Sequence, residues 1–192
     1  MRSLRTQRLT LDPVTLTNAD ALWRIMQADQ LREYQDVPHY TLAEFRDRVA
    51  GRRKKIIRNV GGRFEWLIQR NDTGEAIGWI SLRLGECGGE AAEMGYSLLE
   101  GSRGHGYATE GVWAVVNEAL TEVGLGMIEA ACVVQNDASR RVLERLGFIR
   151  MKIQRNGAVV RSRAVDIYIY RMDAATWKRK ALEETLSEPI DG

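Results

Sequence analysis

An α/β domain with one mixed β-sheet flanked by helices is the fold that the sequence predicts, and three observations support it. Apolar and polar residues alternate loosely in three segments between residues 62 and 99, with turn residues between the segments, as in antiparallel strands. From residue 107 onward, apolar residues recur every three or four positions, which is the period of a helix. Residues 127–134 are almost continuously apolar, as in a strand buried on both faces. Helices interleaved with strands in this way indicate one mixed sheet.

Length and composition fit a single domain over residues 1–192. The chain is 44% apolar and 28% charged, and 28 Lys and Arg against 26 Asp and Glu give a formal net charge of +2. These values exclude wholesale disorder and a strongly basic nucleic-acid-binding domain. No apolar run approaches the ~20 residues of a membrane span, and no secretory signal is visible, so we expect a cytoplasmic protein without a membrane partner. Cys87 and Cys132 are too few for a disulfide framework, and no cluster has metal-ligand spacing, so no metal is expected.

The N-terminal half should contain a short strand, two helices and a three-stranded meander. Asn18 or Asp20 is the expected cap of the first helix. Thr41 and Glu44 have the spacing of a capping box, and the apolar stripe of the second helix continues to Ile56. The expected strands cover residues 9–13, 63–69, 76–84 and 92–99. The other face of the second helix is basic. We favour a solvated face over a contact with RNA, an acidic protein or a phosphate for Arg46, Arg48, Arg52, Arg53, Lys54, Lys55 and Arg58.

The C-terminal half should alternate helices and strands. A helix from Tyr107 should end at Gly124, and a second helix should begin at Asn136 and end at Gly147. The tail is helical from Asp173 and frays after residue 188, so the core covers about residues 4–177. The expected strands of this half are residues 127–134, 148–153 and 165–169.

The segment Arg103–Ala108 carries the strongest chemical signal. Its glycines allow positive φ angles and a close approach of the backbone to a ligand. The helix that follows offers unpaired N–H groups and the positive end of its dipole, which suit a phosphate or pyrophosphate. A dinucleotide-binding fingerprint is excluded because Thr109 stands where the third glycine is needed, and the Gly-Lys-Ser/Thr of a P-loop does not occur.

Four ordered segments turn this signal into a resemblance. Together they resemble the GNAT superfamily of acyl-CoA-dependent N-acyltransferases, in its RimJ/RimL-like branch, over roughly residues 4–177. The family's Gln/Arg-x-x-Gly-x-Gly/Ala loop falls on Arg103, Gly106 and Ala108. The segments are AEMGYSL (92–98), RGHGYATE (103–110), NDAS (136–139) and LERLGF (143–148), with a matching opening TQRLTL (6–11) and closing DIYIY (166–170).

The resemblance implies a mostly antiparallel sheet in which two strands splay apart to admit acetyl-CoA or another short acyl-CoA. The loop amides would bind the pyrophosphate, the backbone of the strand before the loop would pair with the pantetheine arm, and an N–H near Leu98 would polarise the thioester carbonyl. Asn136 would reach the cofactor arm while also capping its helix. The implied cofactor-binding residues are Tyr96, Ser97, Leu98, Leu99, Arg103, Gly104, His105, Gly106, Tyr107, Ala108, Thr109, Asn136 and Ser139.

The implied reaction is direct transfer of an acetyl group to a primary amine in a ternary complex. Many relatives place a tyrosine acid where Leu143 stands, so Ser139 or a water would have to serve the leaving thiolate. Glu93 is the candidate base that keeps the amine neutral, and it shares a strand face with Ser97 if alternation holds. Neither cysteine has a partner that would activate a thiolate, which argues against an acyl-enzyme.

The acceptor stays open at this point. Tyr34, His39 and Tyr40 border the loop that usually shapes the acceptor site, and the acceptor is a protein N-terminus or a small-molecule amine. Asp12 and Met151 depart from the usual pattern near this side, which puts a ribosomal acceptor in doubt. A non-catalytic acyl-CoA sensor and a ribosome- or RNA-associated protein are the alternatives. Dimers are common among similar proteins, so a homodimer is also considered.

Overall fold

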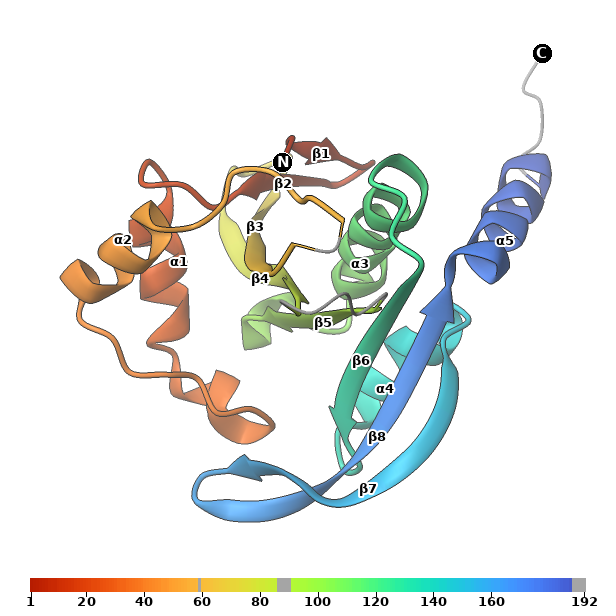
Figure 1. Cartoon of the computed structure of the whole chain (residues 1–192). Coiled ribbons are helices and arrows are strands. Elements are labelled where there is room, and N and C mark those ends of the chain that lie inside the picture. Colours follow the sequence, from red (N-terminus) through yellow and green to blue (C-terminus); the bar gives the residue numbers. More distant parts are fainter. Residues whose placement is uncertain (59, 86–90, 188–192) are drawn as a thin grey trace.

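The computed structural model describes residues 1–58, 60–85 and 91–187 and forms one mixed sheet between helices (Figure 1). In the described residues the sheet has eight strands in the order β1-β2-β3-β4-β5-β6-β8-β7, and each neighbouring pair is antiparallel except β5 and β6. The α/β mixed-sheet prediction is confirmed. The strands are β1 (Leu4–Arg5), β2 (Leu9–Pro13), β3 (Gly62–Arg70), β4 (Ala76–Leu84), β5 (Ala91–Leu98), β6 (Met127–Val133), β7 (Ile149–Val160) and β8 (Arg163–Asp173).

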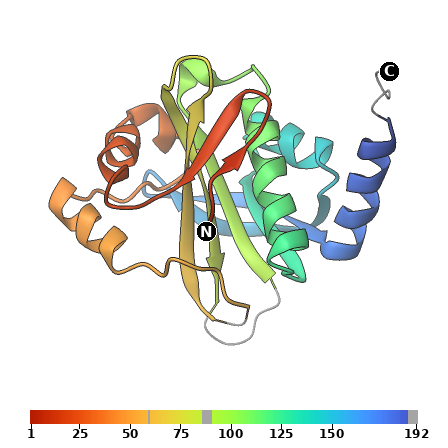
Figure 2. The ribbon, with the colours of Figure 1, turned by 90° about the horizontal axis from the view of Figure 1, so that it is seen from above.

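Helices cover both faces of the sheet. Figure 2 shows α1 and α2 on one side of the strands and α3, α4 and α5 on the other. Trp66 and Tyr170 of the sheet and Trp177 of α5 are fully buried in one core cluster, whereas Phe45 of α2 and Trp79 of β4 belong to a second cluster with α1. The helices are α1 (Ala19–Met26), α2 (Leu42–Ala50), α3 (Tyr107–Asn117), α4 (Asp137–Arg145) and α5 (Ala174–Ser187), with 3₁₀ turns η1 (Asp29–Glu33) and η2 (Glu100–Ser102) and a π-helical turn η3 (Glu118–Glu122).

The predicted helix starts are mostly confirmed. The Thr41 side chain accepts from the Glu44 backbone N–H, and Glu44 accepts from the Thr41 N–H at 2.8 Å, which completes the capping box. Asn136 caps α4 by accepting from the Ser139 N–H at 3.0 Å. Asn18 lies at the N-cap of α1, but its side chain instead accepts from the Thr15 N–H at 2.8 Å.

The second helix is shorter than predicted. It ends at Ala50 with Gly51 as the C-cap, so the expected continuation to Ile56 is wrong. The apolar stripe misled because Arg52, directly after the cap, forms an ion pair with Glu65 on β3, which ties the chain to the sheet. Ile56 still packs against the core, but from an irregular segment.

The strand ends of the C-terminal half also differ. Burial alternates along β6, where Glu129 is only partly buried and Ala131 is exposed, so the strand is not buried on both faces as expected. The alternation is not visible in the sequence because alanine stands at both a buried position, Ala130, and an exposed one, Ala131. The β7–β8 hairpin runs well beyond residues 148–153 and 165–169, because Arg161 and Ser162 make its tight turn with φ angles of 49° and 60°. Cys87 and the residues after Ser187, where fraying was expected, lie outside the described residues.

β5 and β6 separate partway along their length, as the resemblance implied. Ladder pairs join Ala91–Met94 to Met127–Ala130. Beyond these pairs β5 continues to Leu98 and β6 to Val133 without pairing to each other. The gap opens toward the segment that leads into α3 and toward the start of α4.

Candidate active site

A cavity of about 400 Å³ lies where β5 and β6 separate. Its walls come from the ends of both strands, from the loop before α3, and from the first turns of α3 and α4. Leu31 of η1 and, just after it, Tyr34 and Gln35 close the cavity on the α1 side. Segments far apart in the sequence therefore meet at one cavity.

The loop before α3 presents backbone amides to this cavity. Gly104 and Gly106 have φ angles of +79° and +81°, and Gly106 is the N-cap of α3. Tyr107, Ala108 and Thr109 at the helix start line the cavity, so unpaired N–H groups and the positive helix end face it. Arg141 and Arg145 of α4 also line it. This arrangement fits the phosphates of a nucleotide-like ligand.

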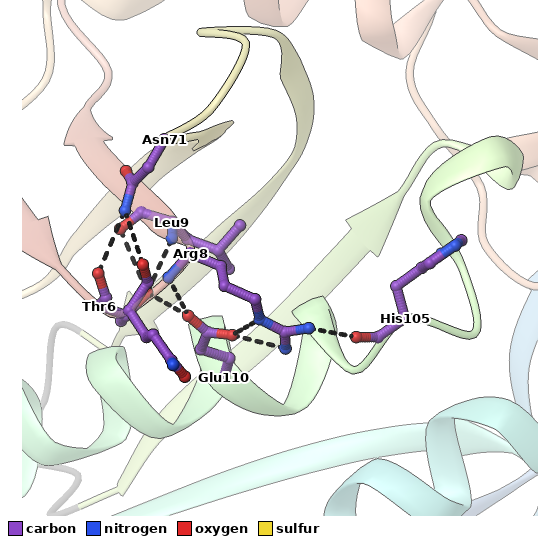
Figure 3. Close-up of polar contacts among 7 residues, drawn as sticks. Thr6, Arg8, Leu9, Asn71, His105 and Glu110 are labelled. Carbon is purple, nitrogen blue, oxygen red and sulfur yellow. Dashed lines mark hydrogen bonds and ion pairs between the residues drawn. The ribbon is translucent and has the colours of Figure 1, made fainter.

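Thr6 and Arg8 of the N-terminal segment bind Glu110 of α3 and the loop before it (Figure 3), and we call this set of contacts the clamp. Glu110 of α3 accepts from the Thr6 hydroxyl at 2.6 Å, from the Arg8 N–H at 2.8 Å and from Arg8 Nε at 2.7 Å. Arg8 Nη1 in turn donates to the His105 carbonyl at 2.9 Å. Burial alone raises the pKa of Glu110, but the hydrogen bonds from Thr6 and Arg8 outweigh it and hold the pKa below its ordinary value. The carboxylate is therefore charged at neutral pH and fixes Arg8 against the loop.

Replacing Glu110 by glutamine should weaken cofactor binding. The amide removes the charge that holds Arg8, so the loop amides lose their fixed positions. If the loop binds acetyl-CoA, as the resemblance implies, the KM for acetyl-CoA should rise about 3- to 10-fold with kcat within twofold. Thiol-release kinetics measure both constants. Lowering the pH of the wild-type protein should have the same effect only as the pH falls through the lowered pKa of Glu110.

Glu118→Gln is the matched control for this prediction. Glu118 also forms an ion pair with an arginine of the N-terminal segment, Arg2, at 2.7 Å, but Glu118 lies on η3, away from the loop. The control should leave the KM unchanged. Equal effects of the two substitutions would show that the clamp does not act on the loop.

The end of β5 directs a backbone donor into the gap. Gly78 of β4 pairs with Leu98, and the Leu99 N–H donates to the Ile77 carbonyl at 2.9 Å. Successive N–H groups of a strand point to opposite sides, so the Leu98 N–H points away from β4, toward β6. The β5–β6 ladder has already ended there.

Ser139 meets two other cavity residues at the first turn of α4. The Tyr96 hydroxyl lies 2.8 Å from Ser139 Oγ and 3.1 Å from the Ser139 carbonyl oxygen. The Cys132 thiol lies in the adjacent wall, buried, and burial raises its pKa, which makes it a poor nucleophile. Leu143, at the position of the absent tyrosine, is fully buried in the core.

Most predicted cofactor-binding residues line the cavity. The exceptions are Leu99, which packs into the core beneath α1 and α2, and His105, which is exposed and stacks on Tyr107 with ring centroids 5.7 Å apart. The residues that do line it are Tyr96, Ser97, Leu98, Arg103, Gly104, Gly106, Tyr107, Ala108, Thr109, Asn136 and Ser139.

The predicted base lies outside this cavity. The β4–β5 register has no bulge, so Glu93 and Ser97 do share a face, as expected. Glu93 forms an ion pair with Arg83 and lines a separate open pocket with Glu129 of β6. Its carboxylate therefore lies away from Ser139.

The three predicted acceptor residues are divided. Tyr34 lines the cavity, whereas His39 and Tyr40 do not. Tyr40 stacks on Phe45 and lies under the Arg48 guanidinium, 4.4 Å from the ring centroid, so its ring stabilises α2. His39 is exposed, with Nδ1 3.3 Å from Arg32.

Sequence reasoning missed Gln35. Its side-chain amide donates to Ser97 Oγ at 2.6 Å, which ties the segment after η1 to the end of β5. Nothing in the periodicity marks this contact, because Gln35 lies in an irregular segment. Over the described residues, no group of three His, Cys, Asp or Glu side chains is arranged to hold a metal, and no helix there is long and apolar enough to cross a membrane.

Comparisons with known proteins agree with this geometry. Residues 8–149 match the family described as "Acetyltransferase (GNAT) domain". The uncharacterized N-acetyltransferase p20 of Bacillus licheniformis is 26% identical over 173 residues, covering 90% of this chain and 96% of that protein.

Solved structures that share the fold include two acetyltransferases of ribosomal proteins. A ribosomal-protein-S5-alanine acetyltransferase from Vibrio fischeri has a TM-score of 0.78 at 16% identity and covers 91% of this chain and 98% of its own. RimL, a ribosomal L7/L12 alpha-N-protein acetyltransferase in complex with coenzyme A, has a TM-score of 0.77 at 20% identity and covers 91% and 99%. The resemblance to the GNAT superfamily is thus confirmed, and the chain belongs to the GNAT acetyltransferase family.

Proposed function

We propose that this protein transfers an acetyl group from acetyl-CoA to a primary amine by direct attack in a ternary complex. The observation that carries the proposal is the single cavity in which the unpaired end of β5, the amino end of α3 and Ser139 meet. A phosphate-binding loop at one end and a backbone donor with a hydroxyl at the other match the two ends of an acyl-CoA. The RimL complex with coenzyme A, which has the same fold, supports this ligand.

In this proposal, each wall of the cavity would hold one part of acetyl-CoA. The amides of residues 104–109 would hold the pyrophosphate, with Arg141 and Arg145 as further cations. The unpaired edge of β5 from Tyr96 to Leu98 would pair with the amide groups of the pantetheine arm. Asn136 would meet the arm from the α4 side while it caps that helix.

The chemistry needs an amine, a donor for the oxyanion and a partner for the thiolate. The neutral amine forms a C–N bond with the thioester carbonyl carbon, and the developing oxyanion accepts a hydrogen bond from the Leu98 N–H. The C–S bond then breaks, sulfur leaves with the electron pair, and the Ser139 hydroxyl donates a hydrogen bond to it. Glu93 is proposed to take the surplus proton of the amine through water, since its carboxylate lies outside the cavity.

The acceptor is proposed to approach along the segment that includes Tyr34 and His39. Relatives named as ribosomal acetyltransferases favour a protein N-terminus, and a small-molecule amine is the second candidate. A cytoplasmic location and a homodimer stay predictions.

A thiol-release screen tests the function. Acetyl-CoA and succinyl-CoA are offered with peptides bearing free N-termini, amino acids, polyamines and aminoglycosides. Turnover with acetyl-CoA and one class of amine is expected. Tight acetyl-CoA binding without turnover of any amine would favour the sensor alternative, and salt-sensitive RNA binding would favour the ribosome-associated one.

Two substitutions test the assigned chemistry. Ser139→Ala should lower kcat about 10- to 100-fold with the KM for acetyl-CoA nearly unchanged, because the hydroxyl acts on the departing sulfur. Cys132→Ala should stay within about threefold of the wild type, since direct attack uses no thiol. Loss of turnover in Cys132→Ala, with an acetylated wild-type cysteine, would show an acyl-enzyme instead. Unchanged turnover in both Ser139→Ala and Glu93→Gln would remove both proposed roles.

A further inference from the structure

The proposed pairing of β5 with the pantetheine arm uses only the backbone of Tyr96 and gives no role to its side chain. It leaves β5 on the α4 side of the sheet and reaches across to the first turn of α4, where its hydroxyl contacts Ser139. The ring is partly buried and packs against the main core. Tyr96, Cys132 and Ser139 line the same cavity.

The two contacts of Tyr96 leave two arrangements for its single proton. Tyr96 donates either to the Ser139 carbonyl oxygen, which is 3.1 Å away, or to Ser139 Oγ, which is 2.8 Å away. In the first arrangement the short contact requires Ser139 to donate back to Tyr96, so the serine proton is used internally. In the second arrangement Tyr96 does not use the serine proton, which can point into the cavity or toward the neighbouring Cys132 sulfur, itself a weak acceptor.

We propose that Tyr96 is a positioning residue that donates its hydroxyl proton to Ser139 Oγ and so directs the Ser139 hydroxyl at the departing thiolate. The inference rests on the proposed acetyl transfer and adds a residue to it. No proton leaves Tyr96 in this step: the C–S bond breaks, sulfur takes the electron pair, and the aligned O–H of Ser139 stabilises the charge.

Two features of the environment suit Tyr96 to this role. The Ser139 backbone is held by the Asn136 cap, so only its hydroxyl hydrogen has to be oriented. Burial raises the pKa of Tyr96 well above its ordinary value, so the phenol stays neutral and acts as a donor throughout the working pH range. The Ser139 O–H is therefore polarised by a neutral neighbour and does not itself have to ionise.

Tyr96→Phe tests the proposal because it removes one oxygen and keeps the ring. We expect kcat to fall about 3- to 10-fold, the effect of one lost hydrogen bond, with the KM for acetyl-CoA within twofold. The defect should shrink with an acetyl thioester whose thiol is a better leaving group. Tyr96→Phe combined with Ser139→Ala should be no slower than Ser139→Ala alone, since both act through one hydroxyl.

Tyr168→Phe is the matched control. Tyr168 is also partly buried on the sheet, but it lies on β8 outside the cavity lining, so the loss of its hydroxyl should leave kcat unchanged. A Tyr96→Phe protein with wild-type kcat, or one whose defect multiplies with that of Ser139→Ala, overturns the proposal. Equal thermal midpoints of the two tyrosine variants separate a specific effect from poor folding.

A binding measurement keeps this test separate from the proposed function. The thiol of bound coenzyme A is titrated through the ultraviolet absorbance of its thiolate. Its pKa should rise by about half a unit in Tyr96→Phe and by more than that in Ser139→Ala, and not in Tyr168→Phe. If no amine is turned over, acetyl transfer fails while this titration still decides the role of Tyr96. An unchanged thiol pKa in Tyr96→Phe would refute it.

Discussion

Replacing Gly78 by alanine is expected to lower the free energy of unfolding by more than about 3 kcal/mol. A Cβ at this position would lie 2.1 Å from the Ser97 carbonyl oxygen, 2.7 Å from Leu98 Cδ2 and 3.0 Å from Leu98 Cα. Two of these three atoms belong to the backbone of β5, so no side-chain rotation relieves the contact. Strands β4 and β5 must move apart, and for a chain of this size the thermal midpoint should fall by about 10 °C.

The same displacement should disable the site. Gly78 pairs with Leu98, whose N–H is the proposed oxyanion donor, so molecules that still fold should release little thiol. Gly95→Ala is the matched strand control, because its Cβ would meet only the Ser81 hydroxyl oxygen at 3.3 Å. Thermal unfolding of both variants decides the point. Similar midpoints for Gly78→Ala and the wild type would mean that the close approach of the two strands has no structural importance.

Local signals in the sequence were enough for much of the fold. The Thr41–Glu44 box and the Asn136 cap depend on residues three positions apart, and both form as predicted. The strand predicted at residues 76–84 coincides with β4, since its pattern and its flanking turns agree. The end of α2 was missed because Arg52 turns toward Glu65 on another element. Contacts of this kind have no periodicity along the chain.

The residues of the site likewise fall into those with a local sequence signal and those without one. The glycine loop before α3 was predicted, because positive φ and a following helix leave a local pattern. The clamp behind the loop joins Arg8 to Glu110 across 102 positions, and the Tyr96–Ser139 contact spans 43, so neither had a local signal. His39 and Tyr40 are expected in the acceptor site because they lie in or beside the loop that shapes this site in the family that the sequence resembles. The fold uses Tyr40 to pack α2 and leaves His39 outside the cavity.

The basic segment after Thr41 is only partly available to a partner. Arg46 pairs with Asp20 at 2.8 Å, and Arg48 lies over the ring of Tyr40. Arg52 and Arg63 both reach Glu65, a carboxylate that is only 3% exposed. These contacts pair much of the positive charge with groups of the same molecule, which supports a structural role for this part of the segment over an RNA-binding one.

Arg52→Met is therefore expected to cost about 3 kcal/mol of unfolding free energy, because it leaves the buried Glu65 carboxylate with only the half-exposed Arg63. Methionine keeps a long apolar side chain over Phe45, so the loss reports the charge and not the packing. Arg46→Met, whose ion pair with Asp20 is exposed, should cost less than about 1 kcal/mol in the same denaturant titration. Arg52→Met combined with Glu65→Leu should recover most of the stability, since no uncompensated charge stays buried. If the double variant is as unstable as Arg52→Met, or if Arg46→Met costs as much, the ion pair beneath α2 is not what holds this segment to the sheet.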